Sequence, residues 1–401
     1  MKISLFVLWG GLFLPYVLFA QETKPSAIHE FDLEISAEYR YFFEEASFPG
    51  QKDHFPSLAI RPAYSLEWNK GNESLHFKGF FRVDRDDERT HGDIRELYYQ
   101  KVKRNWELNI GLKKIFWGVT ESNHLVDIIN QTDQVESFDG EQKLGQPMVQ
   151  FTYLTNTLGS FDVFYLPYHR KRNFPGTKGR LRFPIVIETD AIGYENDDLE
   201  EWHPAFALRW KHYFGIVDIG LSEFYGPGRE PLFAFEPNGE IRAFYPIINQ
   251  VGLDLQVTHN AFLWKLESIY RTSDAQDFFA LTAGLEYTFS NINGKGLDIG
   301  VLGEYLFDDR GELALTGLQN DLFFGSRIAF NDVQDTSILF GGIVDLEQSS
   351  TIFSLEAARR LGNSFTVEVE ARFFTNIDDR ELILSNFQAD SFLRLALGWR
   401  L

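Results

Sequence analysis

From residue 29 to the end of the chain, the dominant pattern is an alternation of apolar and polar residues with a period of two. In residues 31–41, for example, Phe31 and Leu33 are separated by Asp32 and followed by Glu34. Successive side chains of an extended strand point to opposite faces, so this pattern predicts strands with one apolar and one polar face. Eighteen such runs are expected, at residues 29–43, 57–68, 73–85, 93–103, 105–116, 147–155, 160–167, 204–213, 215–225, 245–258, 261–271, 277–290, 295–308, 319–331, 335–346, 350–360, 363–376 and 388–401.

The lengths of the runs and of their connections predict the architecture. Most runs are close to the ~9–11 residues that a tilted strand needs to cross a bilayer. Short connections rich in Asn and Gly alternate with long ones at residues 44–56, 86–92, 117–146, 168–203, 226–244, 309–318 and 377–387. Short periplasmic turns and long extracellular loops are typical of bacterial outer-membrane proteins. We therefore predict an all-β chain, a closed antiparallel transmembrane β-barrel of about 18 strands, with 16–18 as the range.

The N-terminal residues predict export. Lys2 precedes an apolar run at residues 3–19, and Ala20 offers a small residue before Gln21. This order is typical of a secretory signal peptide, and an uncleaved membrane anchor is the alternative. The predicted organisation is a signal peptide at 1–20, a periplasmic N-terminal tail at 21–28 and a transmembrane barrel at 29–401. No later run of 18 apolar residues predicts a membrane-spanning helix.

The C-terminal residues predict a closing strand. Leu393, Leu395, Leu397, Trp399 and Leu401 form an alternating apolar face up to the last residue. This pattern resembles the assembly signal of outer-membrane barrels, in which the final residue is usually Phe. The resemblance implies recognition by the barrel-assembly machinery and by periplasmic chaperones. The closing strand of a soluble sheet is the alternative interpretation.

Composition narrows the chemistry. The chain has 401 residues, 39 of them Phe, no cysteine and a formal net charge of -20. The absence of cysteine from the sequence excludes thiolate catalysis and Cys-ligated metals, and the acidic balance argues against nucleic acid as a partner. The common hydrolase, zincin and phosphate-loop motifs are not found in the sequence either. We therefore expect no enzyme, no catalytic residue, no metal and no cofactor.

The polar faces of the predicted strands must line the interior of a barrel in lipid. They carry acidic and basic residues in nearly equal number, which indicates a water-filled lumen of mixed sign. The alternative is that these charges pair across strands, fix the shape of the barrel and conduct nothing. The residues predicted to line the pore or its constriction are Arg40, Arg61, Lys78, Arg82, Lys113, Arg170, Lys171, Arg172, Arg209, Glu286, Glu304, Arg327, Glu368, Glu370 and Arg372.

Two long loops admit two interpretations each. Loop 168–203 has a basic first half and an acidic second half. It either folds into the pore as a constriction or lies on the surface, its basic half facing lipopolysaccharide phosphates. For loop 117–146, a short plug-like helix is one interpretation, and a solvated acidic loop, which we prefer to a metal site there, is the other. Within it, His124 with Glu121 or Asp127 has only generic spacing, so no metal site is predicted.

A local resemblance supports the same class. The strand end from Gly111 to Trp117-Gly118, followed by Asp127, Asn130 and Asp133, resembles a motif of porin-like barrels related to alginate-export-type barrels. In those barrels a strand ends in Gly-(Arg/Lys)-x-x-x-x-Trp-Gly, and an Asn-x-x-Asp segment follows. Here the basic residue, Lys113, comes two positions after the glycine. The resemblance implies an outer-membrane porin-like protein and no particular substrate.

These patterns together predict a passive channel of the bacterial cell outer membrane for small hydrophilic solutes or ions. Its expected partners are outer-membrane lipid, lipopolysaccharide and the solutes themselves, and the sequence leaves monomer and trimer open. A channel for hydrophobic small molecules is one alternative. A non-conducting structural or adhesive barrel is the other.

Overall fold

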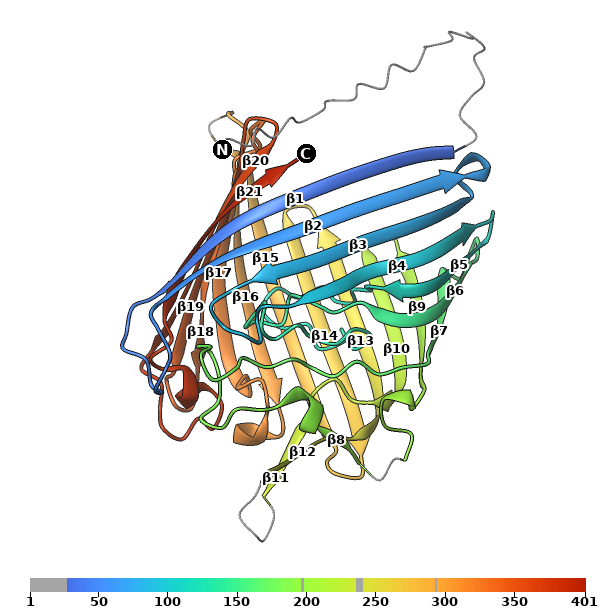
Figure 1. Cartoon of the computed structure of the whole chain (residues 1–401). Helices are drawn as coiled ribbons and strands as arrows, with labels where there is room; N and C mark the ends of the chain where they lie inside the picture. The colour runs from blue at the N-terminus through green and yellow to red at the C-terminus, as the bar shows by residue number, and fades with distance from the viewer. Residues whose placement is uncertain (1–26, 196–197, 236–240, 293) are drawn as a thin grey trace, which may run out of the picture.

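Eighteen antiparallel strands form one closed barrel in the computed structural model, which describes residues 27–195, 198–235, 241–292 and 294–401 (Figure 1). The predicted signal peptide at 1–20 and residues 21–26 of the predicted tail lie outside the described residues. The barrel strands are β1 (Ala27–Phe42), β2 (His54–Trp68), β3 (Glu73–Val83), β4 (Gly92–Val102), β5 (Trp106–Lys113), β6 (Gln146–Leu154), β7 (Ser160–Leu166), β9 (Ala205–Phe214), β10 (Val217–Pro227), β13 (Ile247–His259), β14 (Phe262–Ser273), β15 (Phe278–Ile292), β16 (Leu297–Asp308), β17 (Asn320–Ala329), β18 (Ser337–Asp345), β19 (Thr351–Leu361), β20 (Phe365–Thr375) and β21 (Phe392–Arg400).

Pairing of the first strand with the last closes the barrel. β1 pairs with β21 from Glu34 opposite Arg400 to Phe42 opposite Phe392, and it pairs with β2 on its other side. Closure leaves no free sheet edge, so the backbone groups of the wall are bonded within the protein, as lipid requires. Each of the eighteen predicted runs overlaps one barrel strand, which confirms the predicted fold class and strand number.

The outer surface of the wall is apolar. On neighbouring strands β6, β7 and β9, exposed outward-facing residues include Phe151, Val163 and Leu208, while polar residues between them point inward. Exposure of such a surface to water would be unfavourable, whereas contact with lipid tails is favourable. The chain is therefore a transmembrane β-barrel. No helix among the residues that the structure describes is long and apolar enough to cross a bilayer.

The two rims differ as predicted. One rim carries short turns, such as residues 260–261, together with the C-terminus (Figure 1). The opposite rim carries the long loops, although the connections at 274–277 and 346–350 on this rim are also short. Short 3-10 helices are η1 (Asn69–Gly71), η2 (Thr189–Ala191), η3 (Glu200–Trp202), η4 (Gly311–Leu313) and η5 (Leu384–Phe387).

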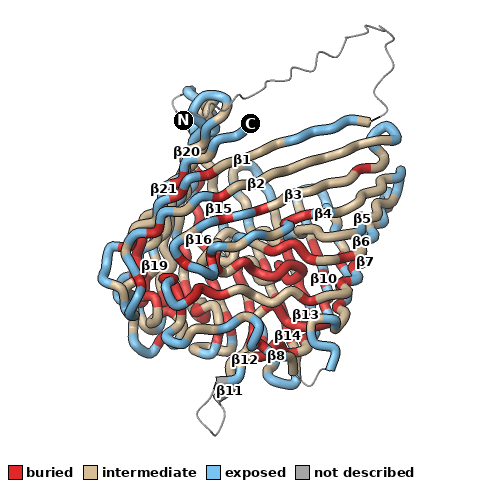
Figure 2. Tube along the Cα trace, viewed as in Figure 1, coloured by how far each residue is buried: buried red, intermediate tan, exposed pale blue. Residues whose placement is uncertain are grey.

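A second, small sheet was not predicted. It consists of β8 (Gly193–Tyr194), β11 (Leu232–Phe235) and β12 (Ile241–Tyr245), all at the long-loop rim. β11 and β12 form an antiparallel pair, and β8 joins β12 in parallel. Strands of two to five residues are too short for alternation to be recognised in a sequence. Figure 2 shows that buried residues concentrate in the half of the barrel nearer these loops, where loop segments enter the lumen.

Candidate functional site: a segment folded into the lumen

Residues 114–145, between β5 and β6, turn into the barrel instead of continuing along the wall. β5 is shorter than β4. The pairing between them ends at Leu97 opposite Leu112, although β4 begins at Gly92, so the first residues of β4 have no partner on β5. The inward segment contacts this part of β4, which has no β5 partner, because Asp133 of the segment pairs with Arg95. Gly145 approaches β4 so closely that a Cβ there would lie 2.1 Å from the carbonyl oxygen of Arg95. Only glycine fits at such a distance.

A carboxylate on the far wall fastens the start of this segment. Glu267, on β14, is fully buried. Its Oε1 accepts hydrogen bonds from the backbone N–H groups of Val119 (2.7 Å) and Thr120 (3.0 Å) and from the Thr120 hydroxyl (2.7 Å). Its Oε2 accepts one from the N–H of Val126 at 3.1 Å. Four donors to one buried carboxylate hold the segment against the inner wall.

Glycine at position 118 makes this contact possible. Gly118 has a φ of +152°, and a Cβ there would lie 3.0 Å from Glu267 Oε1 and from the His124 ring. A side chain would both strain the backbone and push the segment off the carboxylate. The Trp117-Gly118 pair of the sequence motif therefore allows the inward segment to attach to the wall.

A second carboxylate continues the attachment. Glu304, on β16, accepts hydrogen bonds from the N–H groups of Glu121 and Ser122, both at 2.8 Å, and from the Ser122 hydroxyl at 2.5 Å. The Glu121 carboxylate in turn pairs with Arg327 and lies 3.8 Å from Lys265 Nζ. Seven hydrogen bonds thus join residues 119–126 to two wall carboxylates.

His124 adds a charge to this attachment. Its Nε2 lies 3.1 Å from Glu141 Oε1, and its Nδ1 lies 3.8 Å from Glu267 Oε1. Burial would lower the pKa of His124, but the two carboxylates outweigh it and raise the pKa to about 10. The imidazolium is therefore charged at neutral pH. No group of His, Asp and Glu among the described residues has the arrangement of a metal site.

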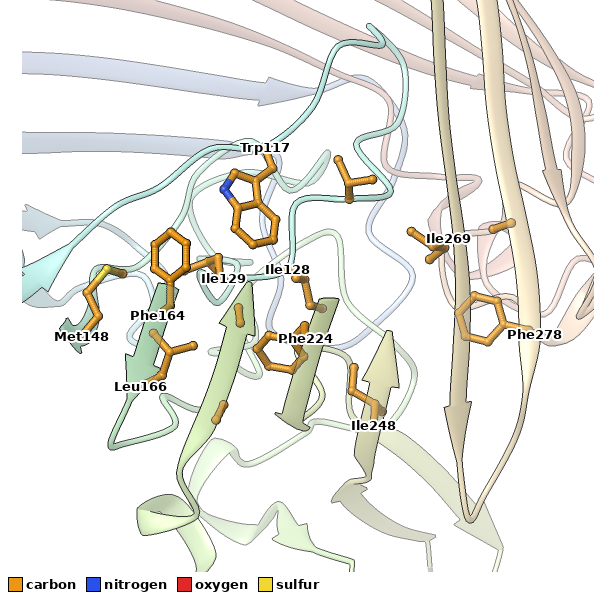
Figure 3. Close-up of a cluster of buried hydrophobic side chains, with 14 residues drawn as sticks. Trp117, Ile128, Ile129, Met148, Phe164, Leu166, Phe224, Ile248, Ile269 and Phe278 are labelled. Atoms are coloured by element: carbon orange, nitrogen blue, oxygen red, sulfur yellow. The ribbon is translucent and has the colours of Figure 1, made fainter. Parts of the chain in front are cut away.

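The remaining motif residues are also structural. Trp117 packs on Phe164, with ring centroids 5.6 Å apart (Figure 3). The Arg209 guanidinium lies over the Trp117 ring at 4.8 Å. The Asp127 carboxylate accepts the N–H of Trp117 at 3.2 Å. The Asn130 side chain accepts the N–H of Ile115 at 2.8 Å and donates to the carbonyls of Lys113 and Leu144.

Our preferred prediction for loop 117–146, a solvated acidic loop, is wrong. Val126, Ile128, Ile129 and Gln131 are buried inside the barrel, as is Asp133, which pairs with Arg95. The alternative, a plug-like helix, is also wrong, since the described residues of this loop contain no α-helix. Wall carboxylates bond the backbone N–H groups that a helix would bond internally, so an irregular backbone is satisfied there.

Loop 168–203 runs across the long-loop end of the barrel. Arg170 pairs with Asp93 at 2.9 Å and Lys171 pairs with Glu201 at 2.9 Å, whereas Arg172 donates to Gln131 at 3.3 Å. Further along, Arg180 reaches Asp390 at 2.5 Å, near the last strand. Phe174, Leu181 and Ile192 are buried. The loop therefore contacts the inward segment, the wall and the connection before β21.

A cavity of about 510 Å³ remains between these loops and the wall. Its lining comes from residues 116–143, from the loop at 172–187, from the connection at 229–233 and from inward side chains of β14 to β20. Of the fifteen predicted pore residues, Arg172 and Arg372 line this cavity. Arg372 pairs there with Glu356 at 2.7 Å and with Asp139 of the inward segment.

The other predicted residues are engaged in pairs elsewhere on the inner wall. Arg61 lies 2.6 Å from Glu34, Lys78 lies 2.6 Å from Glu96, and Glu286 lies 3.4 Å from Lys265. The remaining partners are Glu38 for Arg40 and Arg82, Gln150 and Glu107 for Lys113, Asp254 for Arg209, Glu121 for Arg327, and Arg394 for Glu368 and Glu370. Much of the inner charge is thus paired across strands.

Sequence reasoning did not single out Glu267 as a site residue, nor the cavity residues Phe116, Arg229, Arg271 and Arg310. Glu267 occupies an inward position like any other wall carboxylate, so the strand pattern gives it no distinction. The signal that could have found the attachment is the Trp117-Gly118 motif. A glycine outside a turn can mark a close approach of the backbone to another group.

The barrel is similar in fold to known porins. OpdQ of Pseudomonas aeruginosa matches with a TM-score of 0.51 and 10% identity, over 94% of this chain and 98% of that one. A triple mutant of the Rhodopseudomonas blastica porin matches with a TM-score of 0.44 and 10% identity, over 93% and 100%. No family model and no curated protein matches the sequence. At this identity the likeness is one of fold, so the chain is a closed β-barrel with a porin-like fold.

Proposed function

We propose that this barrel is a channel of the bacterial outer membrane through which small solutes and ions diffuse passively. The observation that carries the proposal is the inward segment, fastened to Glu267 and Glu304 and bordering a cavity of about 510 Å³. A narrowed, charged lumen is the arrangement by which a passive channel selects solutes.

Selection would act through size and charge. The cavity is lined by carboxylates and guanidinium groups, and several of them form ion pairs, such as Arg372 with Glu356. Charges in a narrow, partly desolvated passage act at an effective dielectric below that of water, so they affect a passing ion more than surface charges do. Charges on the outer loop surface are screened within about 8 Å at physiological salt.

The proposal includes the setting of the barrel. The rim with short turns would face the periplasm and the long-loop rim the exterior, where lipopolysaccharide would contact the loops. The chain would reach the membrane with its signal peptide removed, through periplasmic chaperones and the barrel-assembly machinery.

Single-channel recording in planar bilayers tests the proposal. Purified, refolded barrel should produce stepwise currents in KCl, and neutral sugars of increasing size should enter liposomes at decreasing rates. A heat-unfolded sample of the same protein is the control. If the folded barrel inserts and yet gives neither currents nor sugar entry, the channel proposal is wrong and a structural barrel is the better conclusion.

A further inference from the structure

We propose that the cavity selects amphiphilic organic anions, molecules that carry one negative group on an apolar body of several carbons. This inference rests on the proposed channel function and names its substrate class. It combines an apolar wall and a cluster of arginines that line the same cavity.

Large apolar side chains stand exposed in this cavity. Phe116 is 59% exposed and Ile185 is 57% exposed, and both line the cavity, although each belongs to a segment between strands. Exposed apolar groups on the outside of the barrel contact lipid, but these two face the interior. Exposure of these two side chains to water is unfavourable, and an apolar solute in the cavity would remove them from water.

Three separate segments add aromatic rings to the same lining. Phe138 comes from the inward segment, Phe183 from loop 168–203 and Phe387 from η5. The ring centroids of Phe138 and Phe387 lie 5.0 Å apart, and those of Phe183 and Phe387 lie 5.7 Å apart. The facing wall supplies Ile343 from β18 and Ile352 from β19. Hydrated ions gain nothing from such a wall, whereas a hydrocarbon body packs on it.

One part of the charged lining is rich in arginine. Arg271 lies 3.1 Å from Glu230, and Arg310 lies 2.6 Å from Asp308. Arg229 donates to the carbonyls of Ile128 and Ile129, and Arg172 donates to the Gln131 side chain. Neither Arg229 nor Arg172 has a carboxylate within ion-pair distance in the part of the chain that the structure describes.

Four guanidinium groups therefore share two carboxylates in this cluster, which consists of Arg172, Arg229, Arg271 and Arg310 with Glu230 and Asp308. Burial alone would raise the pKa of Glu230, but the charges of Arg271, Arg310 and Arg172 lower it to about 2. The carboxylate is thus ionised, and the cluster still has a net positive charge of about two. An entering anionic group would meet an attractive field.

The arginines and the apolar residues of the wall come from different elements. Arg271 lies on β14, and Arg229 and Arg310 lie just beyond the ends of β10 and β16. The apolar residues of the facing wall lie on β18, β19 and η5. A solute that spans the cavity can therefore place its charged group at the arginines and its body on the wall. The volume of about 510 Å³ is within the range of roughly 300–1,000 Å³ of small-molecule sites.

The test is a block experiment on the wild-type barrel in planar bilayers, in constant KCl. Acetate, butyrate, hexanoate and octanoate are added to one side, and the concentration that halves the ion current is measured. Burial of one CH₂ group corresponds to about a fourfold gain in affinity. We expect the half-blocking concentration to fall at least twofold for each added CH₂. Octylammonium, a cation of matched length, should block at least tenfold more weakly than octanoate.

Two variants locate the effect. Phe116→Ser should weaken the dependence on chain length, and Arg310→Gln should reduce the preference for octanoate over octylammonium. Matched controls are Leu313→Ser, an exposed apolar residue outside the cavity lining, and Arg359→Gln, which pairs with Asp332 at the short-turn rim. Both controls should behave as wild type. Heat-modifiable migration of each variant verifies that the barrel is folded.

The outcomes separate the two proposals. Normal KCl currents with block that is independent of chain length, or equal for anion and cation, would overturn the selection of amphiphilic anions and leave the channel intact. A folded barrel without KCl current would overturn the channel and this inference with it. Because the wild-type series alone decides the matter, loss of a variant during folding leaves the test valid.

Discussion

Replacement of Glu267 by Gln should release the inward segment from the barrel wall. Gln has the shape of Glu but no charge, and its NH₂ group cannot accept a hydrogen bond. Glu267 accepts four hydrogen bonds. With the Gln carbonyl at the Oε1 position, three of them would become bonds to a neutral group, and the N–H of Val126 would point at the NH₂ group, which is also a donor. The barrel strands themselves keep all their backbone bonds, so the wall should still form.

The magnitude follows from these four bonds. A hydrogen bond to a charged group contributes about 1.5–3 kcal/mol, and one between neutral groups about 0.5–1.5 kcal/mol. Loss of the charge should therefore cost about 1 kcal/mol at each bond, or roughly 4 kcal/mol for attachment of the segment. Since 1.4 kcal/mol is tenfold, the detached population should rise by a factor of roughly a thousand.

Two assays detect the release. Single-channel currents of Glu267→Gln should be larger or noisier than those of wild type, because the segment no longer holds one position in the lumen. External protease should also cut within residues 126–133, which the wild-type fold buries. Glu368→Gln is the matched control, because Glu368 is a wall carboxylate that contacts Arg394. Wild-type currents and protease resistance in Glu267→Gln would refute the attachment.

Three further outcomes are expected. The pKa of His124 is raised to about 10, so its charge stabilises the attached segment fully below pH 6.5, and this contribution should fall as the pH rises towards 10. Current noise should therefore increase between pH 6.5 and 10 in wild type and should not do so in His124→Gln. The chain has no cysteine, so single substitutions can be labelled: Leu313→Cys should react with an impermeant maleimide on intact cells and Val333→Cys should not, and the reverse would contradict the proposed orientation. Deletion of Trp399–Leu401 removes the end of the strand that joins β1 to β20 and should abolish heat-modifiable barrel in the membrane, whereas normal assembly would contradict the proposed C-terminal signal.

Alternation and turn chemistry predicted the barrel because both are local. Residues 31–41 alternate as a strand wherever they pair, and β1 is found there. The same holds for residues 388–401, where β21 closes the barrel against β1. Strand number, strand limits within a few residues and the difference between the rims follow from such local patterns together with the length that a bilayer requires.

The contents of the lumen could not be predicted in this way. Glu267 lies 141 residues or more from the backbone groups that it binds, and Glu304 lies 182 or more from its own. Arg271 and Arg310 likewise meet Glu230 and Phe278 only after the strands have closed. In the sequence each of these residues is an ordinary polar position on a strand or beside one.

The sequence by itself therefore determined that this chain forms a transmembrane barrel of about 18 strands with loops of unequal length. Only the tertiary structure decided that residues 114–145 enter the lumen, and that apolar and arginine-rich linings meet in one cavity. The physical reason is that the two faces of a strand are set by a local pattern, in which residues two positions apart share a face. The place of an irregular segment depends instead on buried donors and acceptors that must find partners, and closure of the barrel brings those partners from distant strands.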